Sequence, residues 1–141
     1  MNFSRVINGI LRRLHNQKYR KYGRGHIFDI CVDDMKFKLN FKDIPIMDEA
    51  IIQRIEGKRE PDTIVTLKSI LKKDHKVLEL GSCDGFFTLI ISKCVPEGDI
   101  VAVEPDARYF DVLKENINLN NLKNVGAHRV FITNYTPKDN L

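Results

Sequence analysis

The sequence predicts an α/β protein whose central part has the order strand, helix, strand, helix, strand. Three observations support this prediction. The short apolar run at residues 76–80 leads directly into a turn with two glycines, Gly81 and Gly85. Apolar residues at helical spacing follow over 86–94, and a second apolar strand at 100–103 ends on Glu104. A glycine turn before a helix, with an acid at the end of the next strand, is typical of a nucleotide-type site in an open parallel sheet.

Length and composition predict a single cytoplasmic domain. The chain has 141 residues, 43% hydrophobic and 30% charged, which is ordinary for a globular protein. It has no apolar run long enough for a transmembrane helix and no uninterrupted apolar stretch typical of a secretory signal. Cys31, Cys83 and Cys94 form no Cys-x-x-Cys motif, and the four histidines show no ligand spacing. We therefore expect reduced thiols and no metal site.

The net charge of +4 is concentrated near the N-terminus. Seven of the 23 Lys and Arg residues precede Asp29, whereas none of the 19 Asp and Glu residues does. The basic character therefore belongs to an N-terminal arm, and we expect no nucleic acid among the partners of the domain.

Residues 1–25 are expected to form an amphipathic helix followed by a polar linker. Apolar residues recur at spacings that place them on one stripe of a helix: Phe3, Val6, Ile7, Ile10, Leu11 and Leu14. Arg5, Arg12 and Arg13 lie off this stripe. Two interpretations are open: the helix packs on its own domain or a partner, or it makes a peripheral contact with an anionic membrane.

A β-hairpin and two helices are predicted next. Residues 26–41 alternate between apolar and polar, with Asp33-Asp34 between the two runs. A helix is expected over 44–55, and a second begins at Pro61, in a first turn where the missing N–H costs nothing. The buried side of this second helix is expected to consist of Ile64, Leu67, Ile70 and Leu71.

After Glu104, another helix is predicted over 106–119 and a third strand over 125–133. The chain is therefore divided into a basic helix and linker (1–25), a domain (26–133) and a polar tail (134–141).

Two acids beside the glycine turn, Glu79 and Asp84, bear on the nature of the ligand. They would repel a pyrophosphate but would suit a cation such as the ammonium of an amino acid. Glu104 would accept from two ribose hydroxyls, because a carboxylate is a bidentate acceptor. The spacing Gly-x-x-x-Gly also differs from the dinucleotide pattern Gly-x-Gly-x-x-Gly. S-adenosylmethionine, a nucleoside joined to an amino acid without a phosphate, fits these features.

Two segments, VLELGSCDGFFT and VAVEPDARYFDVLKENINLNNLKNV, resemble class I (Rossmann-like) S-adenosylmethionine-dependent methyltransferases. Within this class the chain resembles the FkbM-like family, since REPDTIVTLKSILKKDHKVLEL matches its acid-proline helix and the later helix has an Asn-rich end. The resemblance covers about residues 27–132. It implies a partial Rossmann-like methyltransferase fold, in which 26–133 form the N-terminal half of a C-terminally truncated domain.

The resemblance also implies roles for individual residues. The methionine end of the cofactor would be lined by Glu79, Gly81, Ser82, Cys83, Asp84 and Gly85. Glu104 would hold the ribose, with Pro105 and Asp106 flanking the adenine. Thr88 would support the turn.

Other roles for three of the acids stay open. Glu60 either faces the cofactor or merely starts a helix. Asp84 either lines the site or makes an Asx-type turn, and Glu104 either holds the ribose or ends a solvated strand. Cys83 is not expected to be a catalytic thiol.

A complete domain of this family has further strands, and the strand at 76–80 corresponds to one at the centre of the sheet. Here that strand would be an edge with unpaired N–H and C=O groups. Three outcomes are open. The strand pairs with a second polypeptide or with its own copy; the N-terminal hairpin covers the exposed face; or the chain is a marginally stable truncated product.

We therefore predict the cofactor-binding half of an S-adenosylmethionine-dependent methyltransferase that acts on oxygen, with a sugar, lipid or small-molecule acceptor. The sequence identifies no general base. The alternatives are a non-catalytic remnant or interaction module and, with less support, an NAD-binding dehydrogenase fragment.

Overall fold

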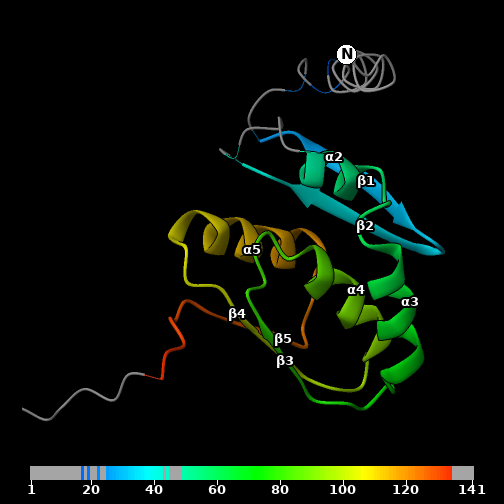
Figure 1. The fold of residues 1–141 in the computed structure, drawn as a ribbon, viewed down its shortest axis with the longest axis vertical. Coiled ribbons are helices and arrows are strands. Elements are labelled where there is room, and N and C mark those ends of the chain that lie inside the picture. Colours follow the sequence, from blue (N-terminus) through cyan, green and yellow to red (C-terminus); the bar gives the residue numbers. More distant parts are fainter. Residues whose placement is uncertain are drawn as a thin grey trace, which may run out of the picture.

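The computed structural model describes residues 17, 19, 22, 25–42, 44 and 49–134, which are arranged in layers (Figure 1). A three-stranded parallel sheet forms one layer, and two helices lie across one of its faces. An antiparallel hairpin packs on the far side of these helices. The amphipathic helix predicted near the N-terminus and the tail beyond residue 134 lie outside the described residues.

The central unit has the predicted order: β3 (Val77–Leu80), α4 (Phe86–Cys94), β4 (Ile100–Val103), α5 (Ala107–Leu119) and β5 (Val125–His128). The strands are parallel and lie in the order β3-β4-β5, so β3 is an edge. The third strand is shorter than predicted. Its partner β4 ends at Val103, opposite His128, and no other described strand pairs with residues 129–133.

The predicted hairpin is confirmed. It consists of β1 (Ile27–Val32) and β2 (Met35–Asn40), which pair antiparallel with Val32 opposite Met35. The turn Asp33-Asp34 joins them, and Asp33 adopts a left-handed φ of 53°. Every second residue of β1 is buried, as its alternating sequence predicts.

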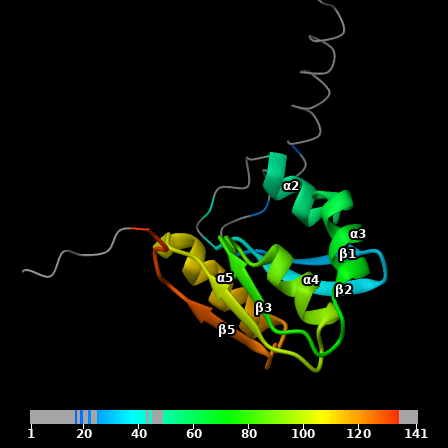
Figure 2. The same ribbon diagram turned by 60° about the horizontal axis from the view of Figure 1, so that its bottom comes forward.

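Two short helices connect the hairpin to the sheet, α2 (Glu49–Ile55) and α3 (Pro61–Ile70). Residues 45–48 of the predicted 44–55 helix lie outside the described part of the chain. Helix α2 packs on β1, and α3 lies beside α4 (Figure 2). The prediction of a buried Ile70 was wrong, because α3 packs on α4 through one narrow side that includes Ile64, and Ile70 is 59% exposed.

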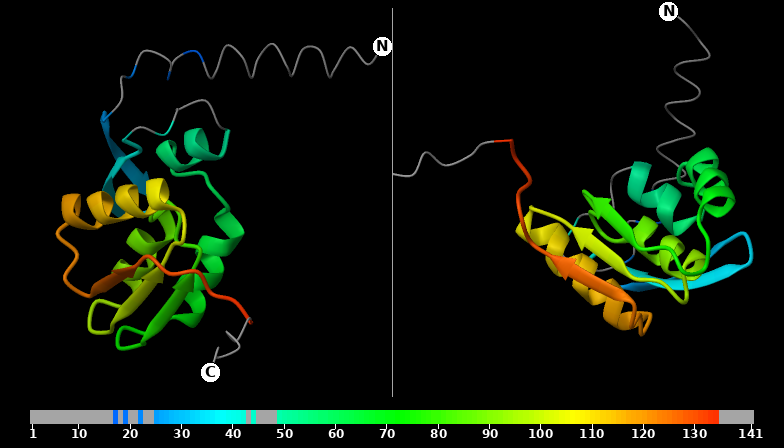
Figure 3. Two further views of the ribbon diagram at one scale, coloured as in Figure 1. Left: turned by 90° about the vertical axis from the view of Figure 1, so that its left-hand side faces the viewer. Right: turned by 90° about the horizontal axis from the view of Figure 1, so that it is seen from below.

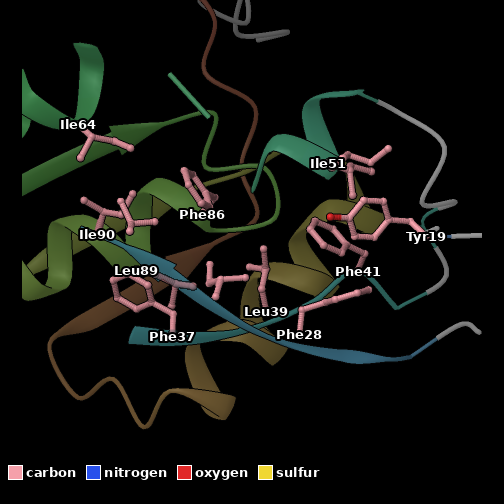
Figure 4. Packing of buried hydrophobic residues seen from close by; sticks show 13 residues of the cluster. Tyr19, Phe28, Phe37, Leu39, Phe41, Ile51, Ile64, Phe86, Leu89 and Ile90 are labelled. Carbon is pink, nitrogen blue, oxygen red and sulfur yellow. The ribbon is translucent and has the colours of Figure 1, made fainter. Parts of the chain in front are cut away.

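The largest apolar cluster lies between the hairpin and α4 (Figure 4). Leu39 of β2 is buried there together with Phe86 and Leu89 of α4. On its other side α4 contributes Ile91 to a cluster with Ile100 of β4. Because α4 is covered on two sides, six of its nine residues are buried, which explains its nearly continuous apolar sequence.

The second face of the sheet, over which no described helix or strand lies (Figure 3), carries exposed apolar side chains. Leu78 and Leu80 of β3 are 62% and 58% exposed, and Val101 of β4 lies opposite Leu78. No described helix or strand covers this face. The hairpin packs on the far side of α4 and α5, so the alternative in which it covers the exposed face is wrong.

Within the described part of the chain, no helix is both long enough and apolar enough to span a membrane.

Candidate functional site

The predicted glycine turn lies at the carboxyl ends of β3 and β4. The backbone amides of Gly81 and Ser82 both donate to the Val103 carbonyl, over 2.8 and 3.0 Å. The Gly85 amide closes the turn on the Ser82 carbonyl over 2.8 Å, just before α4 begins. Ligands of open parallel sheets bind in this position, outside the carboxyl ends of the strands.

The two glycines of the turn are needed for different reasons. Both have a left-handed φ, +78° at Gly81 and +85° at Gly85. A Cβ on Gly81 would meet no atom within 4 Å, so this residue borders open space that a ligand can fill. A Cβ on Gly85 would lie 2.8 Å from Leu113 Cδ1, so this glycine allows the turn to pack closely on α5.

Glu104 joins the two loops that form the site. Its side chain is only 7% exposed. One carboxylate oxygen accepts from the Cys83 amide over 2.8 Å, and the other accepts from the Asp106 amide over 2.9 Å. A carboxylate has about four lone-pair sites, so these contacts fix its orientation and leave acceptor capacity for hydroxyl groups. The alternative of a solvated strand end does not describe this residue.

Glu79 points from β3 toward α4. Its carboxylate accepts from the Thr88 hydroxyl over 2.5 Å, so Thr88 supports the acid and not the turn backbone directly. Burial raises the pKa of Glu79, and the hydrogen bond from Thr88 partly offsets this effect.

Asp84 is buried in the turn, and its carboxylate forms an ion pair with an arginine of α2. One oxygen accepts from the Phe86 amide over 3.2 Å, which is the Asx-type contact left open above. The other lies 3.1 Å from Arg54 Nη1, at the end of α2. Burial raises the pKa of Asp84, while Arg54 opposes that shift. Asp84 is therefore neither exposed nor unpaired, contrary to the expectation of a free acid beside the ligand.

Cys83 follows Ser82 with a left-handed φ of 53°. Burial raises the pKa of its thiol to about 11, and the charge of Asp84 adds to the shift. A thiol with this pKa is protonated at neutral pH, whereas the nucleophile would be the thiolate. Burial of the Cys83 thiol therefore disfavours the thiolate that a nucleophile would need.

The other predicted residues take different positions. Asp106 caps α5, accepting from the amides of Arg108 and Tyr109 over 2.8 and 3.4 Å. The hydrogen bonds from Arg108 lower the pKa of Asp106. Glu60 precedes α3 with a left-handed φ of 46°, makes no side-chain cap and pairs with Arg59 over 2.5 Å.

A hollow of about 280 Å³ lies beside the turn at the carboxyl ends of the strands. Its lining is Leu80, Gly81, Val103, Pro105, Val130, Phe131 and Ile132. The wall is mostly apolar, so the hollow suits a flat apolar group such as a nucleobase. Pro105 belongs to this wall, and its place beside an adenine stays a prediction.

Sequence reasoning missed residues 130–132, Arg54 and Asn116. Residues 130–132 were read only as the end of a strand, and Arg54 only as part of a helix far upstream. Asn116 carried a signal in the sequence, because it interrupts the apolar stripe of α5. In the structure it is 0% exposed. A polar residue on a buried helix face needs a hydrogen-bond partner, and Asn116 Nδ2 donates to the Asp84 carbonyl over 2.7 Å.

Among the described residues, no group of three or more His, Cys, Asp or Glu side chains is arranged to hold a metal ion.

Solved structures share this fold. TYW2 from M. jannaschii in complex with AdoMet superposes with a TM-score of 0.52 at 22% identity, over 75% of this chain and 44% of that chain. TYW2 from P. horikoshii in complex with MeSAdo superposes with a TM-score of 0.50 at 23% identity, over 77% of this chain and 38% of that chain.

No protein-family model and no curated protein matches this sequence. The chain spans less than half the length of the structures named above. The identities are low, so the likeness concerns the fold: this chain has a partial Rossmann-like methyltransferase fold.

Proposed function

We propose that the chain binds S-adenosylmethionine as the cofactor-binding part of a methyltransferase. One observation carries this proposal. The buried carboxylate of Glu104 is held between the glycine turn and the loop before α5, next to an apolar hollow. A carboxylate beside an apolar hollow, with an open space at Gly81, matches a ribose between a base and an amino-acid chain.

Each part of the cofactor has a counterpart in the chain. Glu104 accepts from the ribose hydroxyls, and the hollow that includes Pro105 and Phe131 takes the adenine. Glu79 faces the ammonium of the methionine part, and the open side of Gly81 leaves room for that chain. Asp84 contributes by shaping the turn, since its carboxylate is paired with Arg54. The bound cofactor would supply an electrophilic methyl group on a sulfonium.

We further propose that the acceptor is a hydroxyl oxygen of a sugar, lipid or small molecule, and that the chain belongs with the FkbM-like family. The support is the motif REPDTIVTLKSILKKDHKVLEL with Glu104-Pro105 and the Asn-rich end of α5. Incubation with methyl-labelled S-adenosylmethionine and a panel of alcohols and amines tests this. Labelled methyl ethers are expected, and label on nitrogen or carbon alone would contradict transfer to oxygen.

Isothermal titration with S-adenosylmethionine, S-adenosylhomocysteine and NADH tests the cofactor assignment. We expect the first two to bind and NADH not to bind. Glu104→Gln keeps one acceptor oxygen but loses the charge, so affinity for S-adenosylmethionine should fall about 10- to 100-fold. Glu97→Gln, at an exposed position after α4, is the matched control and should bind like the wild type. Binding of NADH alone would instead support a dehydrogenase fragment.

A second polypeptide that carries further strands is proposed as the partner of β3. Support comes from the edge position of β3, the exposed apolar face, and related folds more than twice as long as the aligned segment. The same face is the observation that favours a non-catalytic interaction module. Binding of S-adenosylmethionine by the isolated chain separates the two, since a module without a cofactor would not bind it.

The arm at residues 1–25 is proposed to make peripheral contact with anionic membranes, based on its basic composition and apolar stripe. Co-sedimentation with phosphatidylserine vesicles should fall when residues 1–25 are deleted. Equal sedimentation of both proteins would contradict the contact.

A further inference from the structure

Asn116 of α5 and Asn120, the residue that follows α5, both pair with the backbone edge of β2. Asn120 accepts from the Lys38 amide over 2.8 Å and donates to the Lys38 carbonyl over 2.7 Å. Asn116 accepts from the Asn40 amide over 2.8 Å and donates to the Asn40 carbonyl over 2.9 Å. The asparagines are four apart on a helix and their targets are two apart on a strand, so the side-chain amides imitate a neighbouring strand.

The two asparagines differ in their third contact. Asn116 Nδ2 also donates to the Asp84 carbonyl in the glycine turn, over 2.7 Å. Asn120 Nδ2 instead donates to the Asn116 carbonyl within the helix, over 2.8 Å. Of these two side chains, only the fully buried Asn116 connects the hairpin to the turn, whereas Asn120 is partly exposed.

The contact from Asn116 orients a peptide group of the site. The Asp84 carbonyl and the Gly85 amide belong to one planar peptide unit, so holding the oxygen also holds the N–H. That amide donates to the Ser82 carbonyl and closes the turn. The Asp84 side chain is held separately by Arg54 of α2. Asp84 is thus fixed at its carbonyl by α5 and at its carboxylate by α2, both outside the turn.

We propose that Asn116 is a positioning residue that sets the glycine turn for the amino-acid part of the cofactor and couples hairpin docking to cofactor binding. The proposal rests on the proposed function for its ligand. Asn116 touches no cofactor atom in this scheme; it acts through the Asp84–Gly85 peptide. Binding of the adenosine part depends on Glu104 and the apolar hollow, so this part of the affinity should depend much less on Asn116.

Two ligands and two variants test this inference. S-adenosylhomocysteine carries the amino-acid part, and 5′-methylthioadenosine lacks it. Asn116→Ala should weaken the binding of S-adenosylhomocysteine about tenfold or more. It should change the affinity for 5′-methylthioadenosine by about twofold at most. Asn120→Ala, which loses the equivalent contacts with β2, should leave both affinities within about twofold. Titrations are made well below the unfolding midpoint of each variant.

Equal weakening of both ligands by Asn116→Ala, or equal effects of the two variants, would overturn the inference. If Asn116→Ala does not fold, Asn116→Ser takes its place, because Ser loses the amide donors without placing a buried charge opposite the Asn40 and Asp84 carbonyls. Amide exchange by NMR gives a test without ligand: the Gly85 amide should exchange faster in the Asn116 variant than in Asn120→Ala. Failure of the wild type to bind either ligand counts against the proposed function, whereas unchanged Gly85 exchange counts against the role of Asn116.

Discussion

Glu79 and Glu104 both lie near the carboxyl ends of neighbouring strands, but they have different surroundings. Glu104 accepts hydrogen bonds from two backbone amides, those of Cys83 and Asp106. Glu79 receives one hydroxyl from Thr88, and its burial raises its pKa. In the free protein the ionisation of Glu79 therefore costs stability, and a cationic ligand group would relieve that cost.

Glu79→Gln should stabilise the free protein at pH 8 and weaken S-adenosylmethionine binding. The folded pKa of Glu79 lies above its ordinary value of 4.5, so the folded state binds more protons than the unfolded state between the two values. The penalty is therefore present at high pH and disappears as pH falls through the raised pKa. Urea unfolding from pH 4 to pH 8 should show the gain of the variant shrinking toward low pH. A gain independent of pH, or one shared by Glu97→Gln, would contradict this reasoning.

Cys83 should react slowly with iodoacetamide at pH 8, because its pKa is raised to about 11. Cys31 is exposed and serves as an internal control in the same chain. Site-resolved mass spectrometry should find Cys31 modified well before Cys83. The reverse order would mean that the thiol of Cys83 is not buried as described.

The hairpin and the helices are held together at positions where backbones approach closely. Gly57 follows α2 with a φ of +67°, and a Cβ there would lie 2.1 Å from the Cys31 carbonyl oxygen of β1. Gly25 precedes β1 with a φ of +75° but has no atom within 4 Å of such a Cβ. Both glycines need a left-handed φ, but only at Gly57 would a side chain also collide with a neighbouring element.

Gly57→Ala should destabilise the protein by about 2–5 kcal/mol, the sum of a left-handed Ala and an overpacked contact. Gly25→Ala should cost about 1–2 kcal/mol, from the backbone conformation alone. Urea unfolding of both variants measures the difference. Equal losses would show that the backbone of β1 moves away from residue 57 at little cost.

The whole molecule has one covered and one uncovered sheet face. Helices α4 and α5 cover the face toward the hairpin, whereas Leu78, Leu80 and Val101 are exposed on the other. Large exposed apolar patches on soluble proteins often mark interaction sites. The edge strand β3 adds unpaired backbone groups to that surface, so association is expected at this side of the molecule.

Leu78→Lys should reduce self-association and dye binding of the isolated chain while changing its free energy of unfolding by only about 0.5 kcal/mol. Leu78 is 62% exposed, so little packing is lost. Val65→Lys, at a 64% exposed position on α3, is the control and should leave both properties unchanged. Light scattering over a concentration series and anilinonaphthalene sulfonate fluorescence measure the effect. A similar response of both variants would show that the sheet face has no special role.

The sequence by itself determined the order of the elements and most of their ends. Apolar periodicity and turn chemistry act over a few residues, so the hairpin, the helix at 86–94 and the strand at 100–103 were predictable. The glycine turn and the acid Glu104 followed from the same local patterns. These features are enough to predict where a cofactor site lies along the chain.

Only the tertiary structure decided which groups of the site are free to meet a ligand. Asp84 is paired with Arg54 of α2 and its carbonyl is held by Asn116 of α5, contacts between residues far apart in sequence. The place of the hairpin and the exposure of Ile70 depend in the same way on what packs nearby. Ion pairs, side-chain hydrogen bonds and burial depend on which residues lie close together in space. Local sequence patterns carry no information about that proximity.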